Sequence, residues 1–177
     1  MTPIRPATSR DREAVREVHM RAFPEGEGRV VSNVALNLLG EETTPETISL
    51  VAEADGAVVG HVAFSPVTVE DRKDWKGYIL APLGVVPEFQ RQGLGSRLIE
   101  AGMERLKQMG VHVLFVYGDP EYYGRFGFRA DPASGFSPPY ELQYAFGWQA
   151  VVLNESDPFN GPVTISCVAS LRDSELW

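Results

Sequence analysis

The segment Leu83–Ser96 carries the residue types and spacing that point most directly to chemistry. Its first residues predict a strand that ends at Pro87, and Gln90-Arg91-Gln92-Gly93-Leu94-Gly95 predicts a turn that opens a helix. The first amides of a helix have no acceptor within the helix and lie at the positive end of its dipole. Because glycines there carry no Cβ, an anion can approach the backbone closely, and the turn is a candidate diphosphate site.

The charge near the turn and the absence of two known motifs narrow the class of phosphate ligand that the turn can bind. Arg91 and Arg97 add positive charge near the turn. No Gly-Lys-Ser/Thr follows the glycines, which excludes a Walker loop, and the three-glycine dinucleotide fingerprint is incomplete. On the residues alone, tight packing of glycines at a helix start is the alternative to phosphate binding.

A second motif, Tyr123-Gly124-Arg125-Phe126-Gly127-Phe128, follows one helix and one strand later. A strand ending in Val-x-Pro, the Gly-rich turn and this second motif, at this spacing, resemble the GNAT superfamily of N-acetyltransferases. The longer string from Gly118 to Phe128 is similar to a bacterial YhbS-like subgroup. The resemblance is strong over residues 50–129, weaker over residues 1–40 and poor beyond residue 131.

The resemblance implies an α/β fold with a mixed, strongly twisted central sheet flanked by helices, in which a splayed pair of parallel strands binds CoA. It implies an acyltransferase with acetyl-CoA as co-substrate and no metal. The acetyl group would pass by direct attack to a primary amine of a small molecule or peptide. The strand residues would hold the pantetheine arm, and the backbone amides of the turn would hold the diphosphate. The residues that the resemblance places in this site are Leu83, Gly84, Val85, Val86, Gln90, Arg91, Gln92, Gly93, Leu94, Gly95 and Ser96.

Tyr123 stands at the general-acid position of the family, four residues before Gly127. A tyrosine hydroxyl, with a pKa of about 10, is protonated at neutral pH and can give its proton to the departing thiolate. The alternative for Tyr123 is packing in an aromatic cluster with Phe126 and Phe128, and we assign Tyr122 to that cluster. The amide of Val85 is a candidate for stabilising the developing oxyanion.

No general base is assigned from the sequence. Glu25 and Glu27, between the first two predicted helices, are candidates, with a solvated acidic loop as the alternative. His61, on a predicted strand, is another candidate, with a hydrogen-bonded structural role as the alternative. His19 and His112 are interpreted as structural, and a water relay is an equal alternative to any single residue.

The elements that must position these residues follow from periodicity and turn signals. Residues 93–109 carry an apolar helical face, and strands are predicted on both sides of that helix, so the crossover places two parallel strands together. The full set of expected elements is strands 3–7, 48–54, 57–69, 78–86, 111–117, 146–153 and 163–168, helices from Thr8 or Ser9 to 23, 30–39 and 93–109, and a loop over 131–140.

Length and composition predict a single domain over 1–177, with its motif core at about 50–130 and a variable C-terminal part at 131–177. The formal net charge of −8 argues against a nucleic-acid partner and is compatible with a cationic substrate. No apolar run reaches the length of a membrane span, so we expect a soluble, cytoplasmic protein with no membrane partner. The lone cysteine, Cys167, is expected to be a buried apolar residue.

Alternatives to an N-acetyltransferase remain at this stage. The first is a non-catalytic acyl-CoA-binding sensor or partner domain. The second is an enzyme that uses a longer acyl group or a hydroxyl acceptor. The oligomeric state is open, and Trp148, Phe159 and Trp177 are candidates for a homodimer interface.

Overall fold

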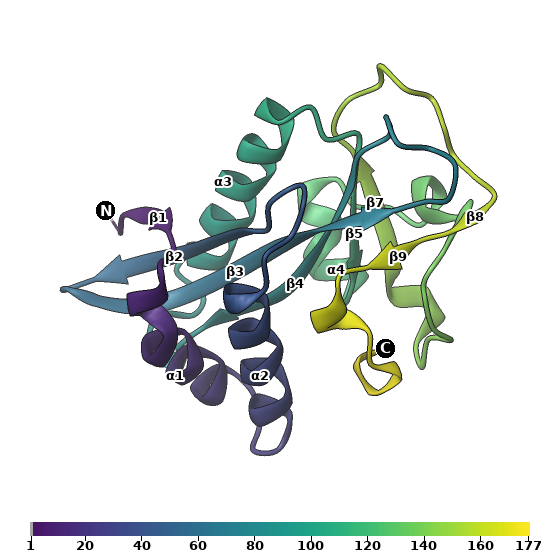
Figure 1. Ribbon diagram of the computed structural model, residues 1–177. Coiled ribbons are helices and arrows are strands. Elements are labelled where there is room, and N and C mark those ends of the chain that lie inside the picture. The colour runs from purple at the N-terminus through teal and green to yellow at the C-terminus, as the bar shows by residue number, and fades with distance from the viewer. Residues whose placement is uncertain (1) are drawn as a thin grey trace. The chain divides into compact units, whose positions relative to one another are not determined.

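The computed structural model describes residues 2–177, which gather into two compact units (Figure 1). The first unit contains the residues up to Phe64 together with Ala81–Met103, and the second contains Ser65–Leu80 and Glu104–Trp177. The prediction of one domain over the whole chain stays a prediction. No helix within residues 2–177 has both the length and the apolar character needed to cross a bilayer.

The first unit is built on an antiparallel sheet. Strand β1 (Ile4–Pro6) pairs with β2 (Ile48–Ala54), and β2 pairs with the first part of β3 (Ala57–Thr68). Asp55 and Gly56 connect β2 to β3 with φ angles of 53° and 79°, the positive values that a two-residue hairpin turn requires. The strands predicted at 48–54 and 57–69 are therefore confirmed, and they form a hairpin.

A bulge in β3 brings the end of strand β4 (Gly77–Val85) beside it. The register shifts between Ala52, which pairs with Gly60, and Glu53, which pairs with Val58, and a glycine within a strand often marks such a bulge. The amide of Val86 then donates to the carbonyl of Val59 at 2.9 Å. In the first unit the strand order is therefore β1, β2, β3, β4.

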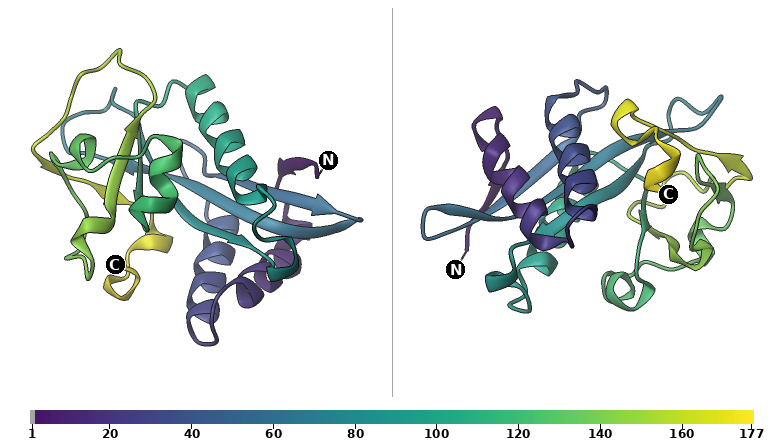
Figure 2. Two further views of the ribbon diagram at one scale, coloured as in Figure 1. Left: turned by 180° about the vertical axis from the view of Figure 1, so that it is seen from behind. Right: turned by 90° about the horizontal axis from the view of Figure 1, so that it is seen from below.

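Helices α1 (Arg12–Ala22) and α2 (Glu27–Gly40) lie side by side on one face of this sheet (Figures 1 and 2). A short 3₁₀ turn precedes α1, and there the side chains of Thr8 and Asp11 cap each other's backbone amides. Helix α2 begins at Glu27 rather than at residue 30, because Gly26 adopts a φ of 92° and ends the connecting segment early.

The two faces of β2 hold different helices. Val51 packs with Val15 of α1 and Ala35 of α2. The opposite face, at Ala52 and Gly60, receives Leu98 from α3 (Leu94–Gln108). Since successive side chains of a strand point to opposite faces, one buried strand serves both layers.

The second unit contains the predicted parallel pair. Residues 77–80 of β4 run parallel to residues 113–116 of β5 (Val113–Tyr117). Strand β7 (Trp148–Val152) pairs with β5 in the antiparallel direction, so the sheet is mixed. The strand–helix–strand crossover and the mixed sheet are both confirmed.

The C-terminal strands differ from the prediction. The single strand expected over 163–168 is two short ones: β8 (Val163–Thr164) pairs with β6 (Phe136–Ser137), and β9 (Ser166–Cys167) pairs with the last part of β3. Strand β6 lies inside the segment predicted as a loop. Two-residue strands are too short to show an alternating pattern, so the sequence carried no signal for them.

Aromatic rings form the core of the second unit. Phe115 stacks on Trp148 with ring centroids 5.2 Å apart, and Phe159 packs edge-on against Phe136. Trp148 and Trp177 are only 8% and 9% exposed. The prediction that the tail aromatics serve a homodimer interface is therefore wrong for the two tryptophans, because their rings are used inside the chain.

Cys167 on β9 is 3% exposed, and burial raises the pKa of its thiol to about 12. A buried neutral thiol is not a nucleophile. The expectation of a buried apolar cysteine is confirmed.

We expect Gly102→Ala to lower the free energy of unfolding by about 1–3 kcal/mol, although alanine normally stabilises a helix interior. A Cβ at Gly102 in α3 would overlap the fully buried ring of Phe64 on β3. The measurement is urea unfolding followed by circular dichroism. Gly40→Ala at the end of α2 is the matched control, because its Cβ would make only an ordinary contact with Arg12 at 3.6 Å. An unchanged midpoint for Gly102→Ala would contradict this packing.

Candidate functional site

The Gly-rich turn lies in the first unit, between β4 and α3. Strand β4 ends at Val85, a 3₁₀ turn covers Pro87–Phe89, and α3 begins at Leu94. Arg91 and Gly93 adopt φ angles of 61° and 78°, in the left-handed region. The strand–turn–helix predicted for this segment is confirmed, with the helix starting one residue after the predicted position.

Two glutamine side chains hold the turn in place. Nε2 of Gln90 donates to the carbonyl of Val85 at 2.8 Å, and Nε2 of Gln92 donates to the carbonyl of Glu88 at 3.1 Å. The family resemblance implies that both glutamines belong to the ligand site, and it gives no sign of this positioning role. Their amides tie the turn back to the segment that leads into it.

The backbone at Gly93 is open. Apart from Gly93 and its two chain neighbours, no heavy atom of the described residues lies within 4 Å of the position that a Cβ would take at this glycine. The amide of Arg97 donates to the carbonyl of Gly93 at 3.1 Å, which places Gly93 at the start of the helix, where the first amides of a helix point outward. An open backbone at the positive end of a helix fits the diphosphate of CoA.

The strand residues of the predicted site have unequal roles. Gly84 is buried against α1, where a Cβ would lie 2.7 Å from Nδ1 of His19. Leu83 and Val85 are half-buried and point to the opposite face of the strand. The amide of Val86 donates to β3, so that hydrogen bond is not available to a pantetheine arm.

Tyr123 lies in the second unit, in the short helix α4 (Pro120–Tyr123) that follows β5. Its ring contacts Tyr122 and Phe128 edge-on, with centroids 5.0 and 5.7 Å apart, and it fills the space beside Gly118. The aromatic packing considered for Tyr123 is therefore present, and the general-acid role of its hydroxyl stays a prediction.

Burial raises the pKa of the Tyr123 hydroxyl, and the nearby Tyr122 and Asp119 raise it further. The group therefore keeps its proton throughout neutral and mildly alkaline pH. A general acid needs this protonation state before the reaction.

The model of the acetyltransferase (GNAT) family matches residues 12–128 of this chain, and this range includes the turn and Tyr123. The chain belongs to the GNAT family. The uncharacterized N-acetyltransferase YjhQ of Escherichia coli K12 is 40% identical over 134 residues, which cover 75% of this chain and 72% of that relative. The uncharacterized N-acetyltransferase YhbS of the same strain is 43% identical over 85 residues, about half of each chain.

Solved structures agree with this membership. E. coli YhbS in complex with CoA superposes on this GNAT protein with a TM-score of 0.79, at 28% identity, over 93% of this chain and 89% of that one. A GNAT acetyltransferase of Brucella melitensis in complex with acetyl-CoA gives 0.72 at 29% identity, over 96% and 97%. The predicted GNAT fold and the class of acetyl-CoA-dependent N-acetyltransferase are confirmed, and the non-catalytic alternative is not favoured. The roles of individual residues stay predictions.

The candidate general bases of this GNAT protein differ in their exposure and hydrogen bonding. Glu25 is exposed in a loop. Glu27 is exposed in the first turn of α2, where the helix dipole stabilises a carboxylate. His61 is fully buried and both of its ring nitrogens are engaged, one with Nε2 of His19 at 2.8 Å and the other with Oγ of Ser49 at 2.7 Å. The structural alternative therefore holds for His61, and His19 is structural as predicted.

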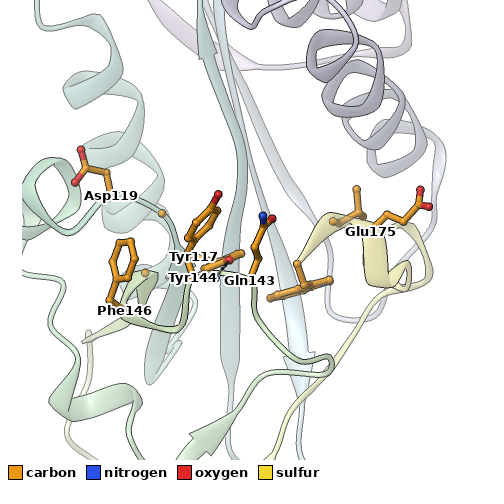
Figure 3. Close-up of a pocket in the computed structure, with 10 residues that line it drawn as sticks. Tyr117, Asp119, Gln143, Tyr144, Phe146 and Glu175 are labelled. Carbon is orange, nitrogen blue, oxygen red and sulfur yellow. Dashed lines mark hydrogen bonds between the residues drawn. The ribbon is translucent and has the colours of Figure 1, made fainter.

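A cavity of about 410 Å³ in the second unit was not anticipated. It lies where β5 ends, and Figure 3 shows Tyr117, Tyr144 and Phe146 around it together with Asp119. The cavity combines residues from three separate segments, 117–119, 143–147 and 175–177. Of the three tail aromatics that the sequence offers as interface candidates, Trp177 lines this cavity.

We expect the stability of the protein to fall as the pH drops below about 6.5 because of the buried histidine pair. Burial lowers the pKa of His19 to about 4 from its ordinary 6.5, and burial and the neighbouring His19 lower that of His61. Between these values the unfolded chain binds more protons than the folded one, so stability is lost as the pH falls through this window. The expected loss is about 1.4 kcal/mol per pH unit for each histidine.

The measurement is urea unfolding from about pH 7 to pH 5, where most carboxylates, with pKa values near 4, remain ionised. The variant His19→Leu/His61→Leu removes both rings and should show a much shallower dependence. An equal slope in both proteins would show that other groups cause the loss.

Proposed function

We propose that this GNAT enzyme holds the diphosphate of acetyl-CoA on the backbone amides of the Gly-rich turn and transfers the acetyl group to a primary amine by direct attack. The observation that carries the proposal is the open, left-handed backbone of Gly93 at the start of a helix of 15 residues. The complexes of E. coli YhbS with CoA and of the Brucella enzyme with acetyl-CoA support this ligand.

The state of the lone cysteine supports direct attack. Cys167 is buried with a raised thiol pKa, so it does not support a covalent acetyl-enzyme. The acceptor amine must arrive at the thioester carbonyl in its neutral form, which is a small fraction of an alkylamine at neutral pH. His61 is fully buried, and Glu25 and Glu27 are exposed to solvent, so none of the three is singled out as the general base. We therefore assign removal of the amine proton to a water relay that leads to solvent.

Tyr123 is proposed to donate the proton that the leaving thiolate needs. The nitrogen–carbon bond forms, the carbon–sulfur bond breaks, and sulfur takes the hydroxyl proton. The nitrogen loses one proton to solvent, and Tyr123 regains one, so the protons balance. Because burial raises the pKa of Tyr123, the protonated hydroxyl is favoured over the tyrosinate once the proton is returned.

We expect Gly93→Val to weaken acetyl-CoA binding by roughly tenfold or more, equal to about 1.4 kcal/mol or more. A β-branched side chain strains a φ of 78° and places atoms on the open side of the turn. Gly110→Val is the matched control, since Gly110 ends the same helix with a φ of 77° and equally open surroundings. Isothermal calorimetry should show lost affinity for Gly93→Val alone, and equal affinities would show that the turn does not hold the ligand.

We expect Tyr123→Phe to lower kcat by about 10²–10⁴-fold with acetyl-CoA affinity nearly unchanged, because the hydroxyl acts only as the thiolate leaves. Phenylalanine keeps the ring contacts with Tyr122 and Phe128, so folding should persist. Tyr122→Phe is the control and should turn over normally. Steady-state kinetics on a confirmed acceptor amine make the measurement, and full kcat in Tyr123→Phe would refute the acid role.

A further inference from the structure

The cavity at the end of β5 is walled by aromatic rings. Tyr117 stacks with Trp177 at 6.2 Å between centroids, and Tyr144 packs against Phe146 at 5.9 Å. The Tyr117 hydroxyl accepts a hydrogen bond from the amide of Tyr144 at 2.8 Å, which holds the 143–147 segment to the strand. Tyr144 and Phe146 are nevertheless 54% and 70% exposed. Large rings left open around a cavity are a binding surface for an apolar or aromatic ligand.

The charge of this cavity has one sign. Asp119 and Glu175 both line it, and in Figure 3 they lie on opposite sides of the rings. No lysine or arginine of the described chain lines the cavity, and none within residues 2–177 forms an ion pair with either carboxylate. Carboxylates and the faces of aromatic rings both attract cations. The cavity is therefore matched to a positively charged group.

The cavity shares a wall with the proposed general acid. Gly118 lines it, and a Cβ on Gly118 would lie 2.6 Å from the ring of Tyr123. Asp119 also lines the cavity and caps α4, the helix that carries Tyr123, by accepting a hydrogen bond from the amide of Glu121 at 3.0 Å. A molecule bound here lies against the residues that position Tyr123.

We propose that this cavity binds the acceptor, and that the acceptor is a cationic primary amine carried on an aromatic ring. The inference rests on the proposed function and specifies its substrate class. The rings hold the apolar body, and the two carboxylates favour the ammonium form before it releases the proton that must leave ahead of attack. A volume of about 410 Å³ is in the range of small-ligand pockets and suits an arylethylamine.

The probe is tryptamine, and its matched control is tryptophan, which differs by one carboxylate. Turnover is followed by the release of CoA thiol from acetyl-CoA, and binding of each amine is measured by calorimetry. Because the added carboxylate meets Asp119 and Glu175, kcat/KM for tryptamine should exceed that for tryptophan at least tenfold.

Three variants test the cavity directly. Asp119→Asn retains the α4 cap, since asparagine caps helices as well as aspartate does. The other two variants are Glu175→Gln and Phe146→Ala. Each of the three should raise KM for tryptamine severalfold to tenfold and leave the affinity for acetyl-CoA unchanged. Glu155→Gln, an exposed carboxylate that does not line the cavity, is the control and should match the wild type.

The outcomes separate the two proposals. Equal use of tryptamine and tryptophan, or cavity variants that behave like Glu155→Gln, would overturn the assignment while leaving the acetyltransferase reaction in place. Weaker acetyl-CoA binding in Phe146→Ala, with the tryptamine KM unchanged, would overturn it in favour of the co-substrate. Tryptamine binding without acetylation of any amine would support the ligand class and contradict the proposed function.

Discussion

The position of the Gly-rich turn depends on how closely α3 approaches β3. Glycine stands on both sides of that contact: Gly60 makes room for Leu98, and Gly102 makes room for the ring of Phe64. Side chains at either place would lift the helix from the sheet, and the amides at its start would move with it. Leu98 and Phe64 are fully buried, so this end of the helix is held by packing rather than by the turn itself.

The opposite face of the first unit supports the same segment. His19 of α1 lies against Gly84, one residue before the end of β4, and it is fixed there through His61 on β3. Strand β4 is thus held from α1, and its last carbonyl is tied to the turn through Gln90. A ligand that relies on backbone amides needs such a rigid frame, because mobile amides would lose entropy on binding.

The sequence predicted those elements whose signals lie within a few neighbouring residues. The strand signals at 48–54 and 57–69, the turn between them and the apolar face of α3 are each encoded within a short stretch of chain, and all three appear where expected. The parallel pair followed from a chirality and connection rule that needs only the order of the elements. The family resemblance added Tyr123, which composition and periodicity do not single out from the rings beside it.

Long-range contacts could not be predicted in this way. His19 and His61 are 42 residues apart, and nothing in either neighbourhood marks the other as its partner. Trp148 and Trp177 were interpreted as surface rings because their burial depends on Phe115 and Tyr117, on a strand far earlier in the chain. The cavity was missed for the same reason, since its three segments come together only in the folded chain.

The placement of the cavity has a consequence for how such enzymes diversify. The family match ends at residue 128, and two of the three segments that line the cavity, 143–147 and 175–177, come after it. They are short turns with few ladder hydrogen bonds, so substitutions and length changes there disturb little of the sheet. With the acceptor and the acyl donor placed as proposed, one copy can therefore change in its tail after gene duplication and acquire a new acceptor while the proposed diphosphate site stays the same.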